Sequence, residues 1–164
     1  SGLAATYRNG HGRLAEAVQT RDAEALHAWR RQAKYLGYQI RLLVQAWPLV
    51  LRPTVRAFEA LTDALGDDHD LSELVRCTRK ADLRKKGRRA LKETAHTRGE
   101  ALQAATWLLG ARLYAEDAPR FAGRMSVYLA TALAEQQQVP VHPLDGLALP
   151  APPNRPFVSD LVSV

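Results

Sequence analysis

An alternating spacing of apolar residues constrains the fold of this chain more than any other feature. Between residues 26 and 47, apolar side chains recur three and then four positions apart without interruption. At about 100° per residue, this spacing gathers them into one stripe along a single α-helix. The stripe consists of Leu26, Trp29, Ala33, Leu36, Ile40, Leu43 and Trp47. The first 138 residues show no strand-like alternation, so the sequence predicts an all-α fold, an antiparallel helical bundle of about five to six helices.

Helix start and stop signals divide this part of the chain into segments. Asp22 and Asp117 are suitable N-caps, because an aspartate can accept a hydrogen bond from a free backbone N–H at a helix start. Pro48 disfavours helical geometry in the residue before it, whereas Pro53 and Gly66 suit the first turn and the end of a third helix. The expected helices cover about residues 3–19, 22–47, 53–66, a segment that starts at the acids of 67–70, and then 83–115 and 117–138.

The end of the chain has a different composition. The last 25 residues hold six of the nine prolines, and proline interrupts helices. The sequence therefore predicts a helical bundle over residues 1–138 and a Pro-rich, non-helical, extended tail over residues 139–164. The tail contains several apolar residues, so we expect it to dock on its own bundle or on a partner chain.

Composition excludes several classes of protein. No run approaches the roughly 18 apolar residues that a membrane span needs. A single cysteine, Cys77, can form neither an intrachain disulfide nor a thiolate zinc cluster, which favours a cytoplasmic protein. The chain begins Ser1-Gly2, and its only methionine is Met125, so we expect a fragment of a longer protein.

The positive charge is concentrated in two regions. The net charge is only +6, but residues 27–41 hold four basic and no acidic side chains, and residues 76–92 hold nine basic and one acidic. On the helix expected over 22–47, the side opposite the apolar stripe carries the basic face: His27, Arg30, Arg31, Lys34, Tyr38 and Arg41. In the segment 83–115, a second set shares one side and forms the basic stripe: Lys85, Arg88, Arg89, Lys92 and His96.

These two surfaces are either solvated helix faces or anion-binding surfaces. A solvated face usually alternates acids with bases, since opposite charges four residues apart attract each other. The basic face has no acid on its own helix, so its cations repel one another unless an anion binds. His27 taken alone is as readily a surface histidine, although within the basic face it can donate to a phosphate.

The sequence Gly-Asp-Asp-His-Asp at residues 66–70 has two interpretations. The first is a helix N-cap cluster, with one acid possibly paired to an arginine. The second is a metal site of a His-Asp phosphohydrolase, which would need a second histidine upstream and a distant aspartate. His11, His27 and Asp117 are available, but no local motif supports them. We favour the first interpretation and expect no cofactor.

Four motifs in order resemble the CHAD domain family, the histidine-containing all-helical domains. They are residues 7–10 (YRNG), 26–36 (LHAWRRQAKYL, continuing through Tyr38 and Arg41), 65–71 (LGDDHDL) and 110–114 (GARLY). The resemblance implies an all-helical fold that binds inorganic polyphosphate through basic side chains and associates with polyphosphate granules. By position it assigns this role to His27, Arg30, Arg31, Lys34 and Arg41, and to Arg8 on the first helix. The basic stripe of 83–115 matches only the general character of the family.

In one respect the chain departs from the family. A complete domain of this family has two similar helical bundles with basic residues between them, whereas this chain has one set of motifs and resembles the second half. Either a first half precedes it in the parent protein, or two chains pair as a homodimer. An incomplete bundle would expose apolar residues, which favours association or a docked tail.

Three functions are compatible with these features. The resemblance favours a non-catalytic polyphosphate-binding module. The same basic helices could bind nucleic acid, although we find neither a helix-turn-helix nor an aromatic platform for bases. An enzyme that acts on phosphates is the third, supported only by His69-Asp70.

Overall fold

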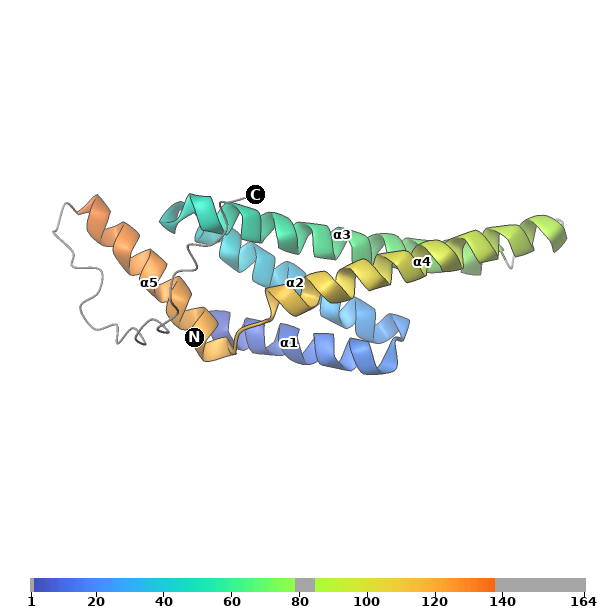
Figure 1. Cartoon of the computed structure of the whole chain (residues 1–164), viewed down its shortest axis with the longest axis horizontal. Coiled ribbons are helices and arrows are strands. Elements are labelled where there is room, and N and C mark those ends of the chain that lie inside the picture. The colour runs from blue at the N-terminus through green and yellow to red at the C-terminus, as the bar shows by residue number, and fades with distance from the viewer. Residues whose placement is uncertain (1, 79–84, 138–164) are drawn as a thin grey trace, which may run out of the picture.

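The computed structural model describes residues 2–78 and 85–137 and consists of helices joined by short turns (Figure 1). No strand occurs in these ranges, so the predicted all-α class is confirmed. Successive helices from α1 to α4 run in alternating directions, and α5 diverges from them (Figure 1). The elements are α1 (Gly2–Thr20), α2 (Ala23–Leu42), a 3₁₀ turn η1 (Val44–Ala46), α3 (Pro48–Thr78), α4 (Lys85–Leu113) and α5 (Ala118–Gln136). The predicted tail lies outside the described residues.

Both predicted N-caps are confirmed. The Asp22 carboxylate accepts from the Ala25 backbone N–H at 2.7 Å, at the start of α2. The Asp117 carboxylate accepts from the Arg120 N–H at 2.8 Å, at the start of α5. These contacts satisfy backbone donors that have no partner within the first turn of a helix.

The predicted boundaries around α3 are wrong. α2 ends at Leu42, before η1, and a single helix then runs from Pro48 to Thr78. Pro53 lies inside this helix, and so does the whole of residues 66–70. Burial explains the continuity, because apolar residues on one side of α3 pack into the core before and after Pro53. They are Leu51, Val55, Phe58, Leu61 and Leu65.

The core forms where α2 meets its neighbours. Trp29 is fully buried and stacks on Trp107 of α4, with ring centroids 5.5 Å apart. The predicted apolar stripe of α2 is buried from Leu26 to Ile40, whereas Trp47 lies beyond the helix and is 43% exposed. Tyr7 of α1 is also buried. The stripe therefore fixes which side of α2 faces inward, and the basic face is directed outward.

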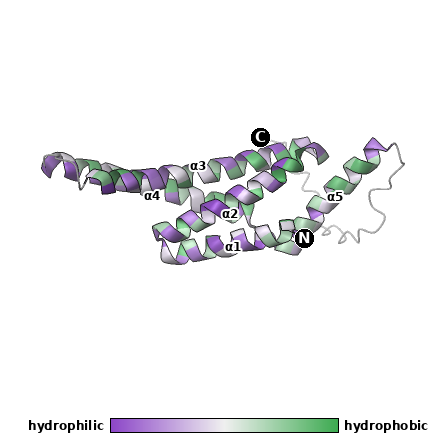
Figure 2. Ribbon diagram, turned by 180° about the vertical axis from the view of Figure 1, so that it is seen from behind, coloured by the Kyte–Doolittle hydropathy of each residue, from purple (hydrophilic) through white to green (hydrophobic). Residues whose placement is uncertain are grey.

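α5 packs less extensively than the other helices. It contacts α1 and η1, and Tyr7 stacks on Phe121 with centroids 4.2 Å apart. Figure 2 shows it mostly in green, and Val127, Leu129 and Leu133 on it are exposed. Exposed apolar residues of the kind that an incomplete bundle would leave are therefore present on this helix. No helix in residues 2–78 and 85–137 is long and apolar enough to cross a membrane.

α3 and α4 are longer than α1 and α2. They have 31 and 29 residues, against 19 and 20 in α1 and α2. At about 1.5 Å per residue, the difference amounts to roughly 15 Å of helix. The excess projects beyond α1 and α2 as a two-helix extension, clear in Figures 1 and 2. We call residues 72–78 and 85–99 the arm.

Candidate anion-binding surface

The basic face of α2 is exposed as predicted, with one side chain partly buried. Arg30 lies across α3, where its Nε donates to the backbone oxygen of Thr62 at 2.9 Å. Its guanidinium packs against Gly66, and a Cβ at that position would lie 2.5 Å from Arg30 Nη2. Gly66 therefore leaves room for Arg30 and does not end a helix. The contact holds the guanidinium in place with several of its N–H groups directed elsewhere.

Acidic residues from α3 compensate part of the basic face. Arg41 forms an ion pair with Glu59 and lies 5.8 Å from the centre of the Tyr38 ring. Lys34 shares a shallow pocket of about 320 Å³ with Glu59 and Asp63. The absence of acids on α2 itself therefore does not mean that its cations lack acidic neighbours. The end of the basic face near Arg41 is close to neutral, and the excess of cations lies toward Arg30.

Two other predicted residues differ in placement. Arg31 is exposed on α2, beside Arg30. Arg8 is exposed on α1 and forms no hydrogen bond or ion pair within residues 2–78 and 85–137. Tyr7, its neighbour, points into the core. None of the described contacts connects Arg8 with the basic face.

Residues 66–70 occupy the middle of α3, so their side chains project in different directions. Asp68 is buried against α4, where Gln103 Nε2 donates to both of its carboxylate oxygens at 3.2 Å. His69 faces α2 instead, and its ring centroid lies 6.1 Å from that of His27. The N-cap interpretation is wrong, because no helix starts here. In the described part of the chain, no group of three or more His, Cys, Asp or Glu is placed to hold a metal ion.

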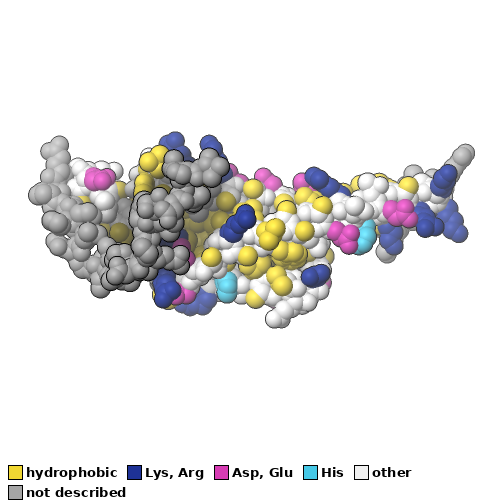
Figure 3. Space-filling model, viewed as in Figure 1, with side chains coloured by type: hydrophobic (Ala, Val, Ile, Leu, Met, Phe, Trp, Pro, Cys, Tyr) yellow, Lys and Arg dark blue, Asp and Glu magenta, His cyan; other side chains and the backbone are white. Residues whose placement is uncertain are grey.

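The basic stripe of α4 lies on the arm. Lys85, Arg88, Arg89 and Lys92 are all exposed, and Lys and Arg side chains gather at the free end of the arm in Figure 3. Arg89 pairs with Glu93 at 2.9 Å, and His96 lies 3.5 Å from Glu100. Both pairs join residues four apart on one helix, so solvent screens them strongly. They leave the side chains free to turn toward another anion.

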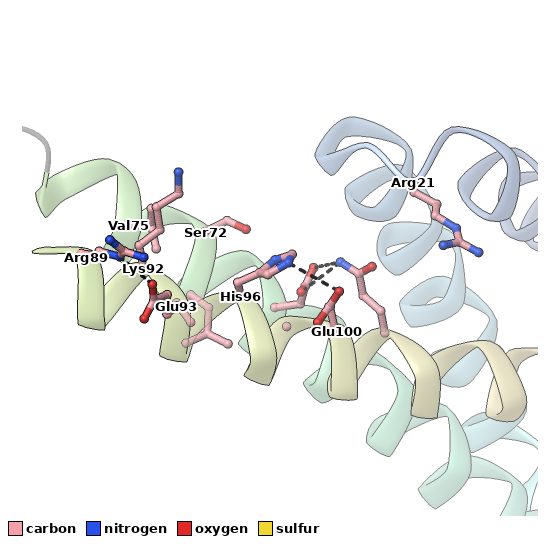
Figure 4. Close-up of a pocket in the computed structure, with 13 residues that line it drawn as sticks. Arg21, Ser72, Val75, Arg89, Lys92, Glu93, His96 and Glu100 are labelled. Carbon is pink, nitrogen blue, oxygen red and sulfur yellow. Dashed lines mark hydrogen bonds and ion pairs between the residues drawn. The ribbon is translucent and has the colours of Figure 1, made fainter.

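A groove of about 960 Å³ runs between α3 and α4 at the base of the arm (Figure 4). Leu71, Val75, Ala95 and Gly99 supply its small and apolar lining, and the basic stripe supplies Arg89, Lys92 and His96. Arg21 lines the groove from the turn between α1 and α2. Its backbone has a φ of 53°, a left-handed conformation that ends α1 at this point.

The groove adjoins the basic face of α2. Asp68 and Ser72 line the groove, and they also line a smaller pocket that contains His27, Arg30 and His69. A path therefore leads from Arg30 past the two histidines to Lys92 and the arm. We call this path the track: Arg30, His27, His69, Ser72, Arg21, His96, Lys92 and Arg89. The structure thus brings the two predicted cation sets together along one surface of α3.

Sequence reasoning missed three members of the track. Arg21 lies in a two-residue turn, where no periodicity indicates a direction. Ser72 has no distinguishing pattern. The sequence interpretations of His69 were a helix N-cap cluster and a His-Asp metal site. A continuous helix through residues 66–70 would have placed it near Gly66, on the side of α3 that contacts Arg30 of α2.

One arginine of α3 on the arm, Arg76, has an acidic partner on its own helix. Arg76 donates to Glu73 through Nε and Nη2 at 2.7 to 3.1 Å. These hydrogen bonds lower the pKa of the Glu73 carboxyl. Arg76 lines neither the groove nor the small pocket, so it is not part of the track.

Comparison with known proteins gives a family match for the first part of the chain. The family model of the CHAD domain matches residues 1–79, which include α1, α2 and α3 and hence the basic face and His69. The family resemblance that the motifs indicated is confirmed for this segment. The comparisons with curated proteins and with solved structures gave no match. CHAD domains are linked in general to polyphosphate, which is the anion that the resemblance implies.

Proposed function

We propose that this chain binds inorganic polyphosphate along the track and the adjoining residues of the basic face and the basic stripe, and does not catalyse its turnover. The observation that carries the proposal is that the groove of α4 and the small pocket beside the basic face of α2 share the lining residues Asp68 and Ser72. A linear polyanion can contact many cations only if they follow one another along a surface. Arginine forks and lysine point charges both suit phosphate oxygens.

The arrangement favours a flexible chain over a duplex. The track passes between helices, over a groove and past a partly buried arginine, so a narrow polymer fits it better than a rigid cylinder. Duplex recognition normally places one helix in a groove with side chains directed at base edges. The guanidinium of Arg30 is held against Gly66 and Thr62 and is not free to reach a base edge. Nucleic-acid binding is therefore the second candidate.

The test is binding of long-chain polyphosphate over a salt series. For a single-stranded polyanion, the logarithm of affinity should fall with log salt by about 0.7 per phosphate contact. The variant Arg31→Gln/Lys34→Gln/Lys85→Gln/Lys92→Gln should bind at least tenfold more weakly, with a shallower salt dependence. Arg98→Gln is the matched control, because Arg98 is exposed on the other side of α4 from the basic stripe.

Three results would contradict the proposal. Affinity that ignores salt would show that cations do not carry the binding. Duplex DNA that competes as well as polyphosphate would favour the second candidate. Release of orthophosphate from polyphosphate would contradict a purely binding role. If binding holds, its consequence in a cell is recruitment of a cytoplasmic protein to polyphosphate granules.

Association with a second helical bundle is part of the same proposal. The bundle would be another copy of the chain or a further segment of the parent protein. The exposed Leu129 and Leu133 of α5 support it, because burying them would stabilise the association. The solution mass of the chain, with Leu133→Ser as the comparison, distinguishes a homodimer from a monomer that lacks its second bundle.

A further inference from the structure

Two histidines from different helices face each other at the middle of the track. His27 comes from α2 and His69 from α3, and their ring centroids are 6.1 Å apart with the rings tilted by 45°. Both side chains are exposed enough to meet a ligand; that of His69 is 47% exposed. They share a small pocket with Arg30 and Ser72. The pair therefore lies where the basic face of α2 meets the groove of α4.

The charged groups around the pair come from every neighbouring element. α2 contributes Arg30, which is held by Thr62. α3 contributes three acids near the pair. Asp70 Oδ1 lies 3.3 Å from His69 Nδ1, and Asp68 lines the same small pocket and accepts from the neutral Gln103 amide of α4. Glu73 also interacts with His69, although its carboxylate is paired with Arg76. Farther along the track lie His96 with Glu100 on α4, and Arg21 and Asp22 at the turn between α1 and α2.

This environment leaves the pair undercompensated when it is charged. Two imidazolium groups about 6 Å apart repel each other, and Arg30 in the same pocket adds to the repulsion. The carboxylates of Asp70, Asp68 and Glu73 balance part of this charge, and Arg76 in turn offsets that of Glu73. A phosphate group seated between the two rings would contact both and offset a further part of it. Proton uptake by the pair and anion binding are therefore coupled, since each favours the other.

We propose that the His27–His69 pair makes polyanion binding by this chain pH-dependent. The inference rests on the function proposed above. Histidine is the side chain whose charge normally changes between about pH 5 and pH 8. With both rings protonated, two further cations stand between Arg30 and the basic residues of the groove. With both neutral, these two cations are lost, so affinity falls as the pH rises.

Two other histidines serve as internal comparisons. His11 lies on α1 near Tyr114, with ring centroids 6.3 Å apart, and is not part of the track. His96 is on the track, but it is paired with Glu100. Neither faces a second imidazole among the described residues.

The experiment measures the affinity for long-chain polyphosphate at constant ionic strength from pH 5.5 to pH 8.5. Internal phosphates of a long chain stay singly charged over this range, so the ligand changes little. A solvent-exposed ion pair contributes about 0.2 to 1 kcal/mol, so two of them predict an affinity loss of about twofold to thirtyfold on raising the pH. The double variant His27→Gln/His69→Gln should lose most of this pH dependence and keep only the part that His96 contributes. His11→Gln should keep the wild-type profile.

A second measurement does not depend on any variant. The imidazole C2–H resonances of the wild-type chain, titrated with and without polyphosphate, report the protonation of each histidine. The inference expects the midpoints of His27 and His69 to rise on binding, while that of His11 stays in place. A bound chain that leaves the His27 and His69 midpoints unchanged would overturn it.

The outcomes separate the inference from the proposed function. No polyphosphate binding at any pH would contradict the function itself. Binding that weakens with salt but has the same strength from pH 5.5 to pH 8.5 would leave the function intact and overturn the pH switch. Equal pH dependence in the wild type and the double variant, both shown by circular dichroism to be folded, would overturn it as well.

Discussion

The basic face of α2 and the basic stripe of α4 carry similar side chains, but the protein holds them in different ways. Behind the basic face lies the core, where Trp29 is fully buried, and Arg30 is fixed by contacts with α3. The basic stripe is on the arm, where Arg89 contacts an acid of its own helix. The first surface is preorganised and partly compensated, and the second is exposed and strongly cationic. One therefore suits the positioning of an anion and the other its attraction.

The largest expected effect concerns stability and compares the packing of side chains beneath the basic face with the packing on the arm. Trp29→Ala should lower the free energy of unfolding by about 3–5 kcal/mol, because it opens a cavity against Trp107 and Gly110. Leu74→Ala is the comparison on the arm, where the side chain is 46% exposed, and it should cost under about 1 kcal/mol. Urea unfolding of both variants measures the difference. Equal losses would mean that the arm is packed as tightly as the core.

The next prediction concerns the tyrosines of the same core. Burial raises the pKa of the Tyr114 hydroxyl well above its ordinary value, and the nearby Tyr7 adds to the effect. Above about pH 10 the unfolded chain loses the proton and the folded chain keeps it. The unfolded state then binds fewer protons, so the free energy of unfolding should fall by about 1.4 kcal/mol per pH unit.

Tyr114→Phe should remove this contribution at little cost near neutral pH. The Tyr114 hydroxyl is buried and has no hydrogen-bond partner among the described residues, so its loss leaves no group unsatisfied. The half-exposed Tyr35 provides the control, and Tyr35→Phe should keep the alkaline decline. The measurement is the free energy of unfolding of each variant from pH 8.5 to pH 11. If it falls with pH as steeply in Tyr114→Phe as in the wild type, the prediction is wrong.

A third prediction separates the positioning of Arg30 from stability. Gly66→Ala places a Cβ 2.5 Å from Arg30 Nη2, so the guanidinium must move and its bond to Thr62 is lost. That loss of about 1 kcal/mol is offset by the higher helix propensity of alanine, also about 1 kcal/mol. Stability should change little, while polyphosphate affinity falls about three- to fivefold, as expected for one displaced cation.

Gly87→Ala is the matched change on α4. No atom lies within 4 Å of the position that its Cβ would take. The variant should therefore gain up to about 1 kcal/mol of stability and bind polyphosphate like the wild type. An affinity loss as large as that of Gly66→Ala would mean that the position of Arg30 is not the cause.

The smallest effect compares the two surfaces by charge alone. Arg31→Gln/Lys34→Gln on α2 and Lys85→Gln/Lys92→Gln on α4 each remove two cations that have no ion-pair partner among the described residues. Each pair should reduce the salt slope by about 1.4, and the quadruple variant by about twice that, if polyphosphate follows the whole track. Should only one pair change the slope, binding would be confined to that surface.

Much of the local structure could be predicted from the sequence. The apolar stripe of α2 is buried from Leu26 to Ile40, and Asp22 and Asp117 cap their helices. These features depend on residues within one or two turns of each other. The predictions that a helix starts near Pro53 and ends at Gly66 are wrong, because contacts with residues far along the chain decide the structure there. The burial of α3 against α2 and α4 outweighed the local preference of these residues.

The candidate site, too, could be predicted from the sequence only in part. The exposure of Arg30, Arg31, Lys34 and Arg41 on one side of α2 follows from helical periodicity, and the family match followed from the motifs around them. The partners of these cations did not follow, since Glu59, Thr62 and Gly66 lie about 20 to 35 positions farther along the chain. Arg8 was assigned by resemblance alone, and no described contact brings it to the track.

The sequence by itself determined the helices, the side of α2 that bears the cations, and the family to which residues 1–79 point. Only the tertiary structure decided that α3 is continuous, that His69 faces His27, and that the cations of α2 and α4 share one track. The physical reason is that periodicity acts within a single helix, whereas a surface formed by three helices depends on how their cores interlock.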